Sequence, residues 1–104
     1  MLNKAIIDRG IKLQGQAAQF DHTMEECGEL IVAISHFFRN RIEVEDLVQE
    51  IVDVRMMCDM LQTIIEEDYS KGKINIFKTI EEEKIVKYNG QLDKLEGLYG
   101  SASK

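Results

Sequence analysis

Apolar residues recur at helical spacing along most of the chain, in stretches separated by short polar breaks. The clearest stretch covers residues 16–38, where an apolar side chain returns every three or four residues. Its members are Phe20, Met24, Cys27, Ile31, Ile34 and Phe38. This spacing predicts a long helix with a narrow apolar seam of the kind that packs in helical bundles.

A second long helix is predicted over residues 44–65, after a short polar connection at residues 39–43 that favours antiparallel packing. It carries two rows at helical spacing. The first row is Val44, Leu47, Ile51, Val54, Cys58, Leu61 and Ile65, and the second is Glu50, Asp53, Met57, Met60 and Ile64. Since one neighbouring helix cannot cover both rows, we expect contact with a second layer of the chain or with a partner subunit.

Weaker patterns flank the two long helices. Residues 2–13 predict a short or broken helix interrupted at Gly10, and residues 77–95 predict a last helix weakened by Gly90. The chain has 104 residues, no Pro, no Trp and only 7% aromatic residues. Length and composition therefore predict a single domain over residues 1–104, all-α, built as a helical bundle of about four helices.

The net charge of −6 disfavours binding to nucleic acid or to an anionic membrane, because both require clustered Lys and Arg. No apolar run approaches the roughly 20 residues of a membrane span, and Asp8 and Arg9 interrupt any signal-peptide core. We therefore expect a cytoplasmic protein. Cys27 and Cys58 fall on the apolar rows, which predicts free thiols in the core rather than a disulfide.

Two pairs of carboxylates stand three residues apart, Glu26 with Glu29 and Glu50 with Asp53. Such residues lie about 60° apart around a helix and about 4.5 Å along it, so each pair shares one face. Both pairs lie beside apolar rows, where repulsion between buried carboxylates favours a bound cation. Glu25 points away from the seam and is expected in solvent.

The chemistry of these side chains selects the cation. An all-oxygen site suits Mg²⁺, with Mn²⁺ as a possible substitute. A di-iron site would require His where the chain has Glu29 and Asp53, which argues against an oxidase or ferritin-like centre. Spacing alone does not exclude the other close acidic residues, which are Glu43, Asp46, Glu66, Glu67 and Asp68.

Several neighbouring residues leave alternatives open. Met57 and Met60 could border a ligand pocket or belong to the core or a subunit interface. His22, one turn before Glu26, could contact a ligand or be a partly exposed polar residue. Lys84 and Lys87 could reach phosphate oxygens or form a solvated face that pairs with neighbouring glutamates.

The run Glu25-Glu26-Cys27-Gly28-Glu29, followed by Glu50-Ile51-Val52-Asp53, resembles the signature of the MazG-like all-α nucleotide pyrophosphohydrolases. The resemblance covers about residues 19–65 and suits small stand-alone members. It implies a helical bundle completed as a homodimer or homotetramer. The implied reaction is Mg²⁺-dependent hydrolysis of a nucleoside triphosphate, either ribose or deoxyribose, to the monophosphate and pyrophosphate.

The resemblance also implies roles for individual residues. Glu26, Glu29, Glu50 and Asp53 would be the metal ligands, with Glu29 or Glu26 as the candidate general base. Gln19 would contact the nucleoside, and Lys84 and Lys87 would contact the phosphates. A different class of protein remains open, a non-catalytic helical dimerisation or regulatory module that keeps the acidic bundle without the chemistry.

Overall fold

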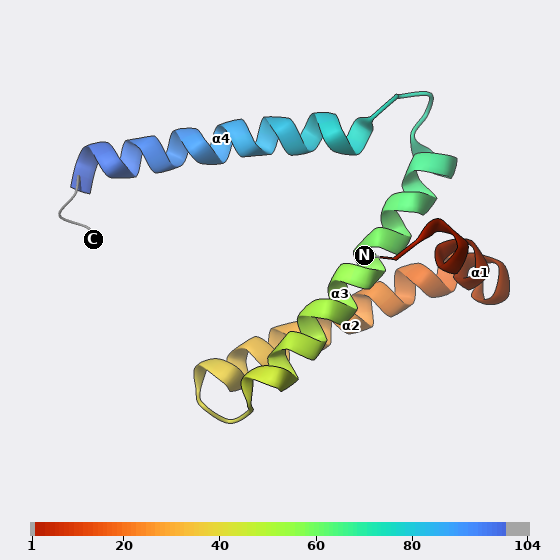
Figure 1. The fold of residues 1–104 in the computed structure, drawn as a ribbon, viewed down its shortest axis with the longest axis horizontal. Helices are drawn as coiled ribbons and strands as arrows, with labels where there is room; N and C mark the ends of the chain where they lie inside the picture. Colours follow the sequence, from red (N-terminus) through yellow and green to blue (C-terminus); the bar gives the residue numbers. More distant parts are fainter. Residues whose placement is uncertain (1, 100–104) are drawn as a thin grey trace. The chain divides into compact units, whose positions relative to one another are not determined.

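The computed structural model describes residues 2–99, and these residues contain helices and no strand. Figure 1 shows α1 (Lys4–Gln14), α2 (Gln16–Phe38), α3 (Val44–Ile64) and α4 (Ile76–Tyr99), with a π-helical segment, η1 (Ile65–Tyr69), continuing α3. The all-α prediction is confirmed, and α2 has the predicted bounds. The chain divides into two compact units, residues 1–69 and residues 70–104, which are described separately.

Helices α2 and α3 lie side by side as an antiparallel hairpin, as the short connection predicted (Figure 1). Asn40 lies in the connection with φ of 59°, a left-handed conformation that Asn tolerates better than most residues. Asp46 then accepts a hydrogen bond through Oδ2 from the backbone N–H of Glu43 at 3.1 Å, which satisfies a donor at the start of α3.

The face of α2 that packs inside the chain is not the apolar seam. The buried residues of α2 are Gln19, Thr23 and Ala33, one row around the helix from the seam. Ile31 remains 69% exposed and Phe38 87% exposed. The prediction that the seam packs in the bundle is therefore wrong for the single chain, because the more polar row is the one that faces α3.

The corresponding face of α3 is its second predicted row. Met57, Met60 and Ile64 are buried there and form a core with Ile7 of α1. A Cβ on Gly10 would lie 2.9 Å from Met60 Cε, so Gly10 permits close packing of α1 and does not break it. Of the two alternatives for Met57 and Met60, the core is the one observed.

The exposed seam also changes the environment of the cysteines. Cys27 and Cys58 are free thiols, but both are exposed in the single chain. The prediction of core thiols is therefore wrong at this level of structure. The physical reason is the same as for Ile31, because both cysteines lie on rows that the chain does not cover by itself.

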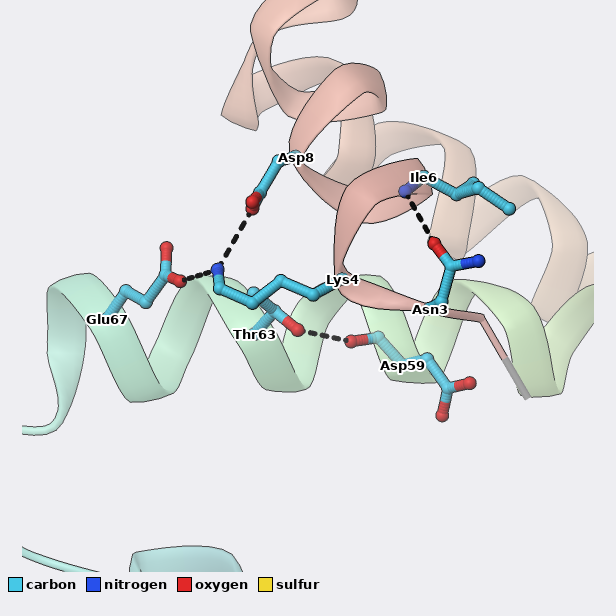
Figure 2. A network of polar contacts seen from close by, with 7 residues as sticks. All are labelled: Asn3, Lys4, Ile6, Asp8, Asp59, Thr63 and Glu67. Carbon is cyan, nitrogen blue, oxygen red and sulfur yellow. Dashed lines mark hydrogen bonds and ion pairs between the residues drawn. The ribbon is translucent and has the colours of Figure 1, made fainter.

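Polar contacts hold the start of the chain against α3 and against η1, and Figure 2 shows the contact of Lys4 with Glu67 of η1. The backbone N–H of Leu2 donates to Asp59 Oδ2 at 3.0 Å. Lys4 Nζ contacts Glu67 Oε1 at 2.6 Å and Asp8 Oδ1 at 3.1 Å. The Lys4–Glu67 ion pair is exposed and orients α1 more than it stabilises it, since solvent screens ion pairs of this kind.

Replacing Asn3 by Ala is expected to lower the free energy of unfolding by about 1 kcal/mol, because the Asn3 side chain caps α1. Its Oδ1 accepts from the backbone N–H of Ile6 at 2.9 Å (Figure 2). Urea denaturation monitored by circular dichroism measures the change. Asn3→Asp is the matched control and should retain most of the stability; an equal loss in both variants would contradict a capping role.

In the second unit, α4 contains no buried residue. The helix continues through Gly90, so the predicted weakening at this glycine does not end it. Among the described residues, no helix is both long and apolar enough to cross a membrane.

Candidate metal centre

Three of the predicted carboxylates meet between α2 and α3. Glu26 and Glu29 from α2 and Glu50 from α3 each offer an oxygen, and these oxygens all lie within 4.8 Å of one another. The spacing of three residues puts the α2 pair on one face, and the antiparallel register brings Glu50 opposite them.

Partial burial separates Glu26 and Glu50 from ordinary surface acids, whereas Glu29 is exposed. Oε2 of Glu26 and Oε2 of Glu50 are both inaccessible to solvent and have no hydrogen-bond partner. The Glu26 side chain is 13% exposed, and its Oε1 lies 3.1 Å from His22 Nε2. Because an ionised oxygen without water or a donor is unfavourable, these two atoms are suited to a ligand that brings positive charge.

The electrostatics show the same mutual repulsion. Burial raises the pKa of Glu26, the charges of Glu29 and Asp53 raise it further, and His22 partly offsets the shift. Burial likewise raises the pKa of Glu50, with added contributions from the neighbouring carboxylates and from a hydrogen bond with Glu29. Both shifts disfavour the ionised form of these side chains, and a bound cation would offset that effect.

Asp53 lies one turn beyond Glu50 on α3 and is partly buried. It is not among the three residues whose oxygens converge, although its charge raises the pKa of both Glu26 and Glu50. Its role as a fourth ligand stays a prediction. Glu25 is exposed, as its position opposite the seam predicted.

The other predicted site residues occupy different settings. Gln19 is buried between α1 and α2, where its amide nitrogen donates to Gln14 Oε1 at 2.9 Å and to the Gly10 carbonyl at 3.3 Å. Its amide therefore joins two helices, and contact with a nucleoside stays a prediction. Lys84 and Lys87 are exposed on α4, in the second unit, and their role also stays a prediction.

His22 is partly exposed, which is one of the two alternatives left open by the sequence, and contact with a ligand stays a prediction. Its side chain is 49% exposed, and its ring nitrogen contacts Glu26. Since the partner is one of the converging carboxylates, His22 orients that carboxylate and offsets part of its charge.

An open groove of about 680 Å³ adjoins the carboxylates, on the side of the α2–α3 connection. Glu29 and Glu50 line both features, and Val32, His36, Ile42 and Asp46 extend the groove away from them. Sequence reasoning did not identify this groove, because its walls come from two helices and a connection whose register the periodicity does not give. Helical spacing from Glu29 to Val32 and His36 is the one signal that pointed towards it.

No protein family matches this chain, and no curated protein or solved structure matches it either.

Proposed function

We propose that this chain is a Mg²⁺-dependent nucleoside triphosphate pyrophosphohydrolase of the MazG-like all-α kind. The observation that supports this most directly is the convergence of Glu26, Glu29 and Glu50 with two buried carboxylate oxygens that lack partners. A divalent cation would satisfy those oxygens, and cations held this way bind triphosphates in many enzymes. The motif resemblance supplies the reaction.

In this proposal Glu26, Glu29, Glu50 and Asp53 hold Mg²⁺, and Mn²⁺ is a possible substitute. When bound, the cation would neutralise charge on the triphosphate and would make a bound water more acidic. Water attacks the α-phosphorus, the bond from that phosphorus to the bridging oxygen breaks, and pyrophosphate leaves. Glu29 or Glu26 accepts the proton from the attacking water.

The proposed assembly is a homodimer or homotetramer, because the exposed seam of α2 needs a cover. Met24, Cys27 and Ile31 line a second open groove with Leu61 of α3, and this groove is almost entirely apolar. Contiguous apolar surface of this kind marks an interaction site in soluble proteins. A second copy of the same hairpin supplies a matching apolar surface.

Incubation of the purified protein with each NTP and dNTP plus Mg²⁺ is expected to release pyrophosphate from at least one of them. Coupled detection of pyrophosphate and chromatography of the monophosphate measure the reaction, and addition of EDTA should abolish it. Mn²⁺ should restore part of the activity.

The alternative is a non-catalytic helical dimerisation or regulatory module, which the exposed seam also favours. A folded protein that releases no pyrophosphate from any nucleotide, with either metal, would select this alternative. Folding is checked on the same sample by circular dichroism.

A further inference from the structure

The groove beside the carboxylates continues the proposed site towards the α2–α3 connection. Its volume of about 680 Å³ falls within the range of about 300–1,000 Å³ that small-molecule sites occupy. Val32 and Ile42 give it apolar walls, and His36 and Asp46 add polar groups. With Glu25, Glu29 and Glu50, charged and apolar side chains both line the groove, and apolar walls with polar groups among them are found in sites for organic ligands.

The apolar groove towards α1, lined by Met24, Ile31 and Leu61, is the surface assigned above to a second copy of the chain. Beyond Asp53, α3 continues with Met57 and Met60, which are buried under α1. On α2 the corresponding position is Gln19, whose amide is bonded within the chain. With that surface covered by a second copy, a nucleotide with its phosphates at Glu29 and Glu50 finds free apolar surface towards the connection.

Charge decides which part of the nucleotide enters the groove. Four carboxylates line it, those of Glu25, Glu29, Asp46 and Glu50. Anionic phosphates are repelled there except next to a bound cation, whereas an uncharged base is not. Repulsion between phosphates and carboxylates is therefore least when the phosphates lie at the cation and the base lies in the groove.

We propose that this groove holds the base of the nucleotide and that Asp46 selects bases with an exocyclic amino group, as in cytosine, over bases with oxygen there, as in uracil; the inference rests on the proposed function. Val32 and Ile42 pack against the faces of the ring. The carboxylate of Asp46 accepts hydrogen bonds and cannot donate when ionised, so it favours an amino group over a carbonyl.

The test compares binding of two probes in Mg²⁺ by isothermal titration calorimetry, α,β-methylene-dCTP and inorganic tripolyphosphate. The first probe reports on base and phosphates together, and the second reports on the cation site alone. Val32→Trp fills the groove from a position that is 52% exposed, so the substitution needs no repacking of the hairpin. It is expected to weaken the dCTP analogue about tenfold or more and to leave tripolyphosphate unchanged.

The matched control is Val48→Trp. Val48 is 49% exposed and lies about 180° around α3 from Met57, away from α2. It should change the binding of neither probe.

A second variant, Asp46→Asn, tests selectivity. The Asn carbonyl can still accept from the Glu43 N–H, so the start of α3 is kept. The preference for the dCTP analogue over the matching dUTP analogue is expected to fall about tenfold.

Three outcomes would overturn the inference. One is nucleotide binding no tighter than tripolyphosphate binding in the wild type, and another is nucleotide binding that Val32→Trp leaves unchanged. The third is an unaltered cytosine preference in Asp46→Asn. If tripolyphosphate still binds with Mg²⁺, these outcomes count against the base site alone and leave the cation site in place. Failure of tripolyphosphate to bind would overturn the proposed function itself.

Discussion

Glu50→Gln and Asp53→Asn are each expected to lower pyrophosphate release at least about a thousandfold while the protein stays folded. Glu50 is one of the three carboxylates whose oxygens converge, and the charge of Asp53 acts on the other members. A metal ion contributes several kcal/mol to stabilisation of the transition state, and about 4 kcal/mol corresponds to a factor of a thousand. Steady-state assays at saturating Mg²⁺ measure the loss.

The same substitution at Glu50 is expected to stabilise the metal-free protein at neutral pH. Burial raises the pKa of Glu50 in the folded state, so the folded chain binds this proton more tightly than the unfolded chain does. The contribution of this proton to stability is therefore fully present below the ordinary glutamate pKa, and it is lost as pH rises through the raised pKa. Glu50→Gln removes that loss, and its advantage should disappear when the pH falls below this window.

Thermal melts in EDTA and in Mg²⁺ measure both effects. Added Mg²⁺ should raise the melting temperature of the wild type and raise that of Glu50→Gln less, because ligand binding stabilises only the form that binds it. Glu45→Gln is the matched control, since Glu45 is exposed on the same helix and outside the cluster. Wild-type turnover in both Glu50→Gln and Asp53→Asn would remove the metal assignment.

Ile31→Glu is expected to convert the proposed homo-oligomer into single chains at micromolar concentration. Ile31 lies in the seam of α2 and is 69% exposed within one chain. In the proposed dimer this side chain is covered, and an unpaired carboxylate in an apolar contact costs several kcal/mol. Since about 1.4 kcal/mol is a factor of ten, the dissociation constant should rise about a hundredfold or more.

Sedimentation equilibrium of wild type and variant measures the change. Gln49→Glu is the control, because Gln49 is an exposed polar residue of α3 outside the seam. A wild type that sediments as a single chain, or an Ile31→Glu protein that keeps the wild-type mass, would contradict the proposed interface.

Helical periodicity predicted part of the carboxylate site. Spacing placed Glu26 and Glu29 on one face of α2, separated them from exposed Glu25 and paired Glu50 with Asp53. It did not show that Glu50 joins the α2 pair more closely than Asp53 does, because that depends on the register between two helices. The groove at Val32 and Ile42 was missed for the same reason.

The amino-acid sequence by itself determined the all-α class, the bounds of α2, the short connection and the acidic pairs, because these follow from the periodicity within single helices. Tertiary structure alone decided which row of each helix turns inward. Both the apolar seam and the neighbouring row with Gln19 and Ala33 are compatible with a buried helix face. In the folded chain the buried row of α2 is the one with Gln19 and Ala33, while α1 covers Met57 and Met60 of α3. This arrangement leaves the more apolar seam of α2 exposed and brings the carboxylates together.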